Sequence, residues 1–178
     1  MSIVSLKHLH FYVLCTKWQS ASNEQQNASG VKIDPQCKND YDDMHNRKAY
    51  SYIIFRISED DTTIIVEKKG AKGSPYKEFV DEMAKSVGDG KECRYGCVDV
   101  EFSFQRQGTD AASHIQKVVF VQCCPDTAAV RKRMLYASSV RGLKASLGLE
   151  SLMQVQAADI TDIDEKVIKH ELMSAQRQ

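Results

Sequence analysis

Three short runs of consecutive apolar residues constrain the fold of this chain more than any other feature. They are Tyr52–Phe55, Thr63–Val66 and Val118–Val121. Successive side chains of a strand point to opposite faces, so an unbroken apolar run predicts a strand that is buried on both faces. Such strands need helices on either side of their sheet. The acidic turn Glu59–Asp61 separates the first two runs and predicts that they form a hairpin.

Helical periodicity supplies the covering layers. Asp34 is a favourable N-cap, and Pro35 suits the first position of the helix that follows. A second helix is predicted to begin at Ser74-Pro75 and to end at Gly88. The residues expected to face the core are Cys37, Tyr41 and Met44 in the first helix, and Tyr76, Phe79, Val80, Met83 and Val87 in the second.

A longer helix is predicted between Pro125 and Gly148. Its expected core stripe is Ala129, Tyr136, Val140, Leu143 and Leu147. Its opposite face would carry Arg131, Met134, Leu135, Ser138, Gly142 and Ala145, with Arg133 and Lys144 between the two faces. Exposed apolar, small and Arg residues are typical of a protein-binding surface, whereas a solvated face would carry Lys and Glu. A second helix of the same chain covering this face is the alternative.

The remaining elements complete an α/β (mixed α+β) domain whose central mixed sheet is sandwiched between helices on both faces. Val98–Phe104 alternates as a strand, Gly108–Asp110 is a turn, and a short strand lies around Met153–Gln156. The inward residues of the last helix are expected to be Ile160, Ile163, Val167 and Ile168. The domain is expected to span residues 28–178.

Residues 1–27 do not fit this pattern. The apolar run Ile3–Leu14 is interrupted by Lys7, His8 and His10, so it is too short and too polar to span a bilayer. A secretory leader is a minor alternative, because a clean apolar centre and a small-residue cleavage site are missing. We expect a disordered or atypical N-terminal extension.

Composition and motifs argue against catalysis. The 24 basic and 24 acidic residues give a formal net charge of zero, so a charged partner must meet a local patch. The six cysteines have neither a disulfide framework's spacing nor a zinc motif. Cys93, Cys97, Cys123 and Cys124 lie in strand-like stretches and are expected to be packed thiols. No catalytic residue, metal or cofactor is expected, and a thiol enzyme is a distant alternative.

One segment of the long helix carries a resemblance. Pro125–Ala128 reads PDTA, and Val130–Ser139 reads VRKRMLYASS, which resembles the signature of the ADF/cofilin family of actin-binding proteins. Ala28–Val31 is similar to that family's mature N-terminus, and Ser51–Phe55 is a third match. The similarity extends from about Ala28 to Ser174 and is greatest to nematode members. It implies the ADF-homology fold, with a central mixed sheet flanked by helix pairs.

The resemblance implies binding to actin monomers and filaments, with filament severing and depolymerisation, by a monomeric protein of the cytoplasm and cytoskeleton. Arg131 and Arg133 match the family's two basic positions on the long helix, and Met134 would be an apolar plug on actin. The full set of implied actin contacts is Ser29, Gly30, Lys117, Arg131, Arg133, Met134, Leu135, Ser138, Ser139 and Lys144. Ser29 also matches the position whose phosphorylation blocks actin binding in the family.

The filament-binding part departs from the family pattern. Lys117 matches one expected basic residue, but Ile115 occupies the position of its partner. Glu171 replaces a basic residue of the last helix, with Lys169 nearby, and Arg106 is a speculative substitute from the facing strand. Monomer binding is therefore the safer expectation; severing is also expected, with weak or altered severing as the alternative.

A phosphoinositide headgroup is a second implied ligand. The residues that the resemblance assigns to it are Arg131, Lys132, Arg133 and Lys144. This gives an alternative function: a phosphoinositide-binding or scaffold module with the same fold and weak or lost filament activity. Monomer binding distinguishes the two functions.

Overall fold

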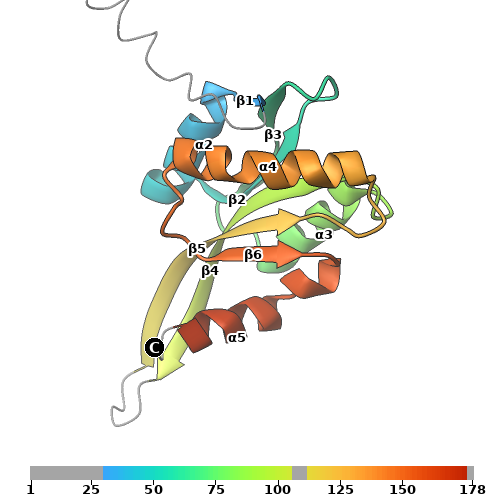
Figure 1. Cartoon of the computed structure of the whole chain (residues 1–178). Coiled ribbons are helices and arrows are strands. Elements are labelled where there is room, and N and C mark those ends of the chain that lie inside the picture. Colours follow the sequence, from blue (N-terminus) through green and yellow to red (C-terminus); the bar gives the residue numbers. More distant parts are fainter. Residues whose placement is uncertain (1–29, 106–111, 176–178) are drawn as a thin grey trace, which may run out of the picture.

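The chain forms three layers, in which a six-stranded mixed sheet lies between two layers of helices (Figure 1). This computed structural model describes residues 30–105 and 112–175. The sheet order is β1-β3-β2-β4-β5-β6. Its strands are β1 (Lys32–Ile33), β2 (Tyr50–Ile57), β3 (Thr63–Ala71), β4 (Arg94–Gln105), β5 (Ala112–Cys123) and β6 (Gln154–Ala157). The pairs β1–β3 and β5–β6 are parallel and the others antiparallel, which confirms the predicted mixed sheet.

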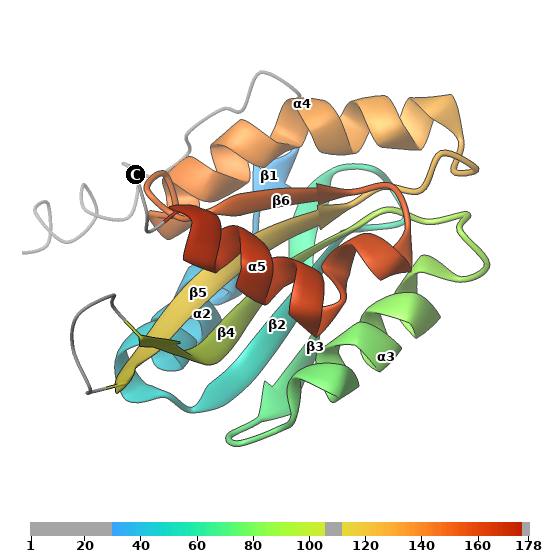
Figure 2. The same cartoon turned by 90° about the horizontal axis from the view of Figure 1, so that it is seen from below.

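Helices cover both faces of the sheet (Figure 2). One hydrophobic core lies under α2 (Pro35–Arg47) and α4 (Val130–Leu147). The other lies under α3 (Tyr76–Val87), the short 3-10 helix η1 (Ile160–Ile163) and α5 (Glu165–Ala175). This arrangement confirms the sandwich that the apolar runs predicted.

The central strand β2 shows why both layers are needed. Ile53 and Phe55 pack in the core under α2 and α4, whereas Tyr52 and Ile54 pack in the core on the opposite face. All four side chains are buried, as expected. The expectation for β3 was too strong, because Ile64 is its only buried residue between positions 63 and 66. β3 lies next to the two-residue β1 at the edge of the sheet, so fewer side chains pack over it than over the central strand β2.

The first two helices begin differently. The carboxylate of Asp34 accepts a hydrogen bond from the Gln36 backbone N–H at 2.8 Å, which confirms it as the N-cap of α2. Ser74 is not a cap. Its backbone N–H bonds to the Ala71 carbonyl at 3.1 Å and closes the turn after β3, so Pro75 becomes the N-cap of α3 without a side-chain hydrogen bond.

The last helical segment is broken in two, which changes its inward residues. Ile163 and Ile168 are buried as expected, but Val167 is exposed. Asp164, with ψ near 142°, is extended between η1 and α5. Because the helical phase restarts at Glu165, residues before and after the break do not share one continuous stripe.

The described cysteines are packed thiols. Cys37, Cys93, Cys97 and Cys123 are buried, and Cys124 is half-buried. Cys123 and Cys124 contact opposite cores, as the alternation of a strand requires. Within residues 30–105 and 112–175, no three His, Cys, Asp or Glu residues form a group able to hold a metal ion. In the same ranges, no helix has both the length and the apolar composition needed to cross a membrane.

Two expectations fall outside the described residues: the extension at 1–27 and the turn Gly108–Asp110. β4 and β5 approach that turn as a long ladder. Their register runs from Arg94 opposite Cys123 to Gln105 opposite Ala112. β4 pairs with β2 only over Tyr95–Val98, so the outer part of the β4–β5 hairpin extends beyond the rest of the sheet (Figure 1).

Candidate functional site

The outer face of α4 is not covered by any described part of the chain. Met134 is 67% exposed and Val130 is 62% exposed, and both are among the few large apolar residues at the surface. Arg131 and Ser138 are exposed on the same side of the helix. The alternative of a second helix packed on this face is therefore wrong for the described residues, and α4 presents apolar surface to solvent.

The buried stripe of α4 confirms Tyr136, Leu143 and Leu147, with Val140 half-buried against the same core, and differs from the expected one at Ser139, Leu135 and Ala129. Ser139 is fully buried, and its hydroxyl donates to the Leu135 carbonyl at 2.8 Å, so its polar group is satisfied away from water. Leu135 is half-buried and packs against the core, and Ala129 is an exposed N-cap. Ser139 thus cannot contact a partner directly in this structure. Ser139 was expected at the actin contact only from the family resemblance, and its spacing from Tyr136 and Leu143 places it on the inner stripe.

Tyr136 fixes the helix to the sheet from its inner side. Its hydroxyl accepts a hydrogen bond from the Ile57 backbone N–H at 2.9 Å. Its carbonyl accepts from the Tyr95 hydroxyl at 2.5 Å, and the two rings lie 4.8 Å apart. Burial raises the pKa of the Tyr136 phenol to about 12, so the hydroxyl stays neutral at physiological pH. These contacts hold the outer residues at a fixed rotation about the helix axis.

Each basic side chain in the first turns of α4 has a carboxylate partner from another segment. Arg131 binds Asp61 of the β2–β3 turn at 3.0 Å, and Lys132 pairs with Glu92. Arg133 binds Asp126 at 2.8 Å. The positive charge that the sequence placed here is thus largely neutralised within the protein.

The three basic side chains differ in exposure. The Arg131 side chain is 86% exposed, whereas Arg133 is half-buried and lies between the two faces, as expected. The buried Nε of Arg133 has no hydrogen-bond partner among the described residues. Hence Arg131 is available to a partner, and Arg133 is held against the protein.

Lys144 lies apart from this group. Its ammonium group donates to Gln154 of β6 at 3.0 Å and lies 5.9 Å from the centre of the Phe120 ring. Eleven residues of helix separate it from Arg133, which corresponds to ~16 Å. The four residues expected to bind a phosphoinositide are therefore not one cluster.

Gly30 is exposed and has a φ of +74°. From there the chain enters β1, where the Lys32 N–H bonds to the Thr62 carbonyl at 2.7 Å. The β2–β3 turn thus contacts both β1 and, through Asp61, the start of α4. Ser29 lies outside the described residues. The start of the domain and the outer face of α4 are joined by this turn.

The predicted filament site lies on β5. Lys117 is exposed, opposite Val100 of β4. Ile115 is half-buried against the core under α3 and α5, so this apolar replacement is used in packing. In α5, Glu171 is exposed and Lys169 pairs with Glu165 at 2.6 Å. Arg106 lies outside the described residues.

Sequence reasoning missed three residues of the α4 surface. Val130 and Arg141 are exposed on the same side as Met134, at positions four before and seven after it. This i, i+4, i+11 spacing is visible in the sequence and would have identified them. Asp61 had no such signal, because its contact with Arg131 depends on the tertiary fold.

The family model for the cofilin/tropomyosin-type actin-binding proteins matches residues 30–173. The chain belongs to this family. Proteins similar to it in sequence include actin-depolymerizing factors. It is 65% identical to actin-depolymerizing factor 2, isoform c, of Caenorhabditis elegans, over 84% of this chain and 99% of that protein. Actin-depolymerizing factor 1, isoforms a/b, of the same organism is 33% identical over 78% of this chain and 71% of its own length.

Solved ADF/cofilin structures share the fold. The solution structure of the ADF-like UNC-60A protein of Caenorhabditis elegans superposes with a TM-score of 0.70 at 31% identity, covering 83% of this chain and 97% of that one. The crystal structure of Streptomyces griseoflavus cofilin gives a TM-score of 0.66 at 26% identity, over 80% and 96% of the two chains. The expected ADF-homology fold is confirmed.

Proposed function

We propose that this ADF/cofilin protein binds actin monomers and filaments through α4 and promotes filament severing and depolymerisation. Family membership and the actin-depolymerizing relatives support this function. The structural observation that carries the assignment to α4 is its uncovered outer face, where Met134 is 67% exposed. Burying an exposed apolar side chain against a partner lowers the free energy of the complex.

The contact we propose combines an apolar centre with a charged border. Met134 and Val130 would be buried against actin, and Arg131 would exchange its exposed pair with Asp61 for a carboxylate of actin. Charge-assisted Arg–carboxylate bonds are strong and directional once water is excluded. Ser138 lies beside this centre and permits close approach.

The test is the double substitution Arg131→Ala with Arg133→Ala. We expect the affinity for ADP-actin monomers to fall by at least about tenfold, because losing a desolvated charge contact costs ~2–5 kcal/mol. Inhibition of nucleotide exchange on actin, followed with a fluorescent nucleotide, measures it. Lys77→Ala with Lys85→Ala on α3 removes the same charge from the opposite face and is the matched control. Equal affinity of the test variant and the wild type would contradict the proposed contacts of these two arginines with actin.

Filament binding is proposed to use a second surface around Lys117. Its exposed ammonium group lies on the β4–β5 hairpin, away from α4. With Ile115 packed in the core and Lys169 paired, this surface carries less free positive charge than the family pattern implies. We therefore expect weaker severing than monomer binding. In a pelleting assay, Lys117→Ala should reduce association with filaments and leave monomer affinity unchanged.

Regulation by phosphorylation of Ser29 is part of the proposal. This residue directly precedes the exposed Gly30, and a phosphate would add about 1.5–2 negative charges beside an interface that must meet an acidic partner. Ser29→Glu should weaken actin binding while Ser29→Ala should not. Equal affinities of these two variants would remove this site from the proposal.

Residues 1–27 are retained as an extension to the domain at 28–178, and deleting them tests for steric hindrance of filament disassembly.

Phosphoinositide binding remains the second candidate function. Arg131, Lys132 and Arg133 supply the charge, but each is paired with a carboxylate that a headgroup must displace. We expect binding that competes with actin and declines steeply with salt. Vesicle co-sedimentation with and without actin tests it.

We further propose a monomeric, non-catalytic protein located in the cytoplasm with the actin cytoskeleton.

A further inference from the structure

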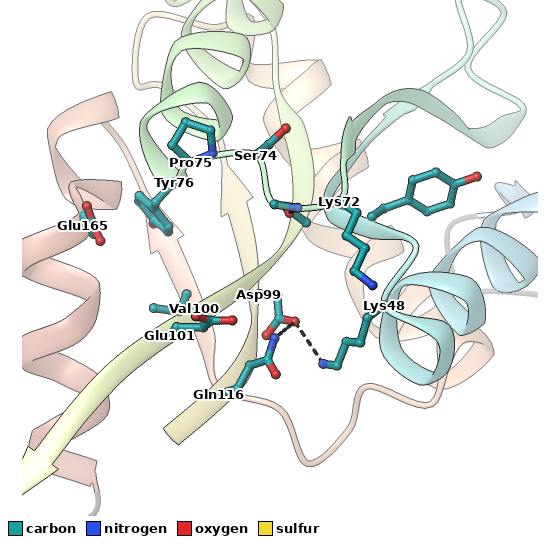
Figure 3. A pocket seen from close by; sticks show the side chains of 13 residues that line it. Lys48, Lys72, Ser74, Pro75, Tyr76, Asp99, Val100, Glu101, Gln116 and Glu165 are labelled. Carbon is teal, nitrogen blue, oxygen red and sulfur yellow. Dashed lines mark hydrogen bonds and ion pairs between the residues drawn. The ribbon is translucent and has the colours of Figure 1, made fainter. Parts of the chain in front are cut away.

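A polar pocket lies at the end of β2 opposite to the Arg131–Asp61 contact. Its volume is about 360 Å³. β2 has 8 residues, so ~25 Å of strand separates the pocket from the turn that α4 contacts. The start of β2, the β3–α3 connection and the middle of β4 supply most of its lining, and Lys48 after α2, Gln116 of β5 and Glu165 of α5 complete it (Figure 3). It is therefore independent of the proposed α4 surface.

The sheet itself opens this pocket. β4 pairs with β2 only as far as Val98, which lies opposite Tyr52. Beyond that pair the start of β2 is no longer paired with β4, so no strand of the described ranges pairs with Asp99 and Glu101 on that side. The hydroxyl of Ser51 accepts a hydrogen bond from the Gly73 N–H at 2.9 Å and fixes the opposite wall.

Asp99 is the unusual group in the pocket. Its side chain is only 7% exposed, yet one of its two oxygens has no hydrogen-bond partner among the described residues. The other oxygen accepts from the Lys48 ammonium group at 2.9 Å and from the Gln116 amide at 2.5 Å (Figure 3). A buried carboxylate oxygen without a donor is destabilising, because it has lost its hydration without replacement. A hydrogen-bond donor placed at this oxygen would stabilise the site.

Opposite charges lie on the two sides of Asp99. Lys72 and Lys48 lie on one side, and Glu101 and Glu165 lie on the other (Figure 3). Lys48 is paired with Asp99, and Glu165 is paired with Lys169. Neither the side chain of Lys72 nor that of Glu101 forms an ion pair or hydrogen bond with the part of the chain that the structure describes. One free positive and one free negative charge thus face the same cavity.

The Lys72 side of the pocket has a second feature that favours an anion. The connection Gly73–Pro75 leads into α3, whose N-cap Pro75 provides no side-chain acceptor for the first N–H groups of the helix. The N-terminus of a helix carries a partial positive charge. This adds to the ammonium group of Lys72 at the same end of the pocket.

We propose that this pocket binds a small zwitterion that carries a primary ammonium group at one end and a phosphate or carboxylate at the other. The ammonium group donates to the unpaired oxygen of Asp99 and faces Glu101. The anionic group faces Lys72 and the start of α3. A ligand with only one sign of charge meets repulsion from one of the two walls. This site goes beyond actin binding and does not depend on it.

The full chain, labelled with nitrogen-15, is titrated with phosphoethanolamine while its amide resonances are followed. We expect saturable shifts at Ser74, Tyr76 and Asp99. Ethanolamine and inorganic phosphate are the single-charge controls and should bind at least about tenfold more weakly. Vesicles of phosphatidylcholine with and without phosphatidylethanolamine identify the source. Binding only to the vesicles that contain phosphatidylethanolamine indicates a lipid headgroup. Binding only to free phosphoethanolamine indicates a soluble ligand.

Two variants connect the binding to these residues. Asp99→Asn removes the carboxylate. Lys72→Gln removes an exposed charge and does not alter a packed side chain. The Lys72 variant therefore remains informative if Asp99→Asn does not fold. Each should weaken phosphoethanolamine binding by about tenfold. Lys77→Gln, on the exposed side of α3, is the matched control. The proposal is overturned if no saturable shift occurs, if either single-charge compound binds equally well, or if Lys72→Gln binds like the wild type.

Discussion

Arg131 on α4 donates a hydrogen bond to Asp61 in the β2–β3 turn at 3.0 Å, although 70 residues separate the two in sequence. The pair lies at the surface, where the Arg131 side chain is 86% exposed. It joins the proposed actin-binding helix to the turn that also holds β1. An incoming carboxylate of actin must compete with Asp61 for the same guanidinium group.

Replacing this carboxylate should strengthen actin binding. For Asp61→Asn we expect the affinity for actin monomers to rise about two- to fivefold at low salt, because an exposed ion pair contributes up to ~1 kcal/mol. The nucleotide-exchange assay measures the change, and Asp81→Asn on α3 controls for net charge. A loss of affinity in Asp61→Asn would instead show that Asp61 positions Arg131 for binding.

The exposed apolar residue of α4 should matter for binding and not for folding. Met134→Ser removes a side chain that is 67% exposed, so the midpoint of thermal unfolding should change little. Monomer affinity should fall by about tenfold, which corresponds to ~1.4 kcal/mol. Thermal unfolding and the exchange assay are measured on the same preparations. Val167→Ser on α5 removes a comparable exposed apolar group and should leave monomer affinity unchanged.

The hydroxyl of Tyr136 should contribute to stability. In Tyr136→Phe the Ile57 backbone N–H loses its acceptor inside the protein, and an unsatisfied buried donor costs ~1–3 kcal/mol. Urea denaturation should show this loss in the free energy of unfolding. Tyr41→Phe is the control, since Tyr41 is also buried but its hydroxyl has no hydrogen-bond partner within residues 30–105 and 112–175. Equal losses in the two variants would contradict the importance of the Ile57 contact.

The Lys132–Glu92 pair should make stability depend on pH. The hydrogen bond from Lys132 lowers the pKa of Glu92 below its usual value. Because the pKa is lower in the folded state, the pair stabilises the protein above the unfolded pKa of ~4.3. That stability is lost as the pH falls through the folded pKa. Both side chains are over one-third exposed, so the contribution should be below ~1 kcal/mol.

The measurement compares the wild type with Glu92→Gln by urea denaturation at a series of pH values from neutral to acidic. The difference in unfolding free energy should be greatest near neutral pH and should decrease on acidification below the unfolded pKa. A difference that stays constant over that range would show that Glu92 contributes by packing and not by charge.

The sequence by itself determined the layers of this protein and where most elements begin. Apolar runs such as Tyr52–Phe55 identified strands buried on both faces, and Asp34 with Pro35 located the start of α2, because these signals depend only on neighbouring residues. The family signature in Val130–Ser139 likewise needs no fold to be read.

Only the tertiary structure decided how the helices are rotated and which charges meet. The hydroxyl of the buried Ser139 is satisfied by the carbonyl of Leu135, and Val167 is outward because the chain is extended at Asp164. The contact of Arg131 with Asp61 and the unpaired oxygen of Asp99 arise between segments that are distant in sequence. Periodicity records which residues share a face, but the contacts across the fold determine what that face meets.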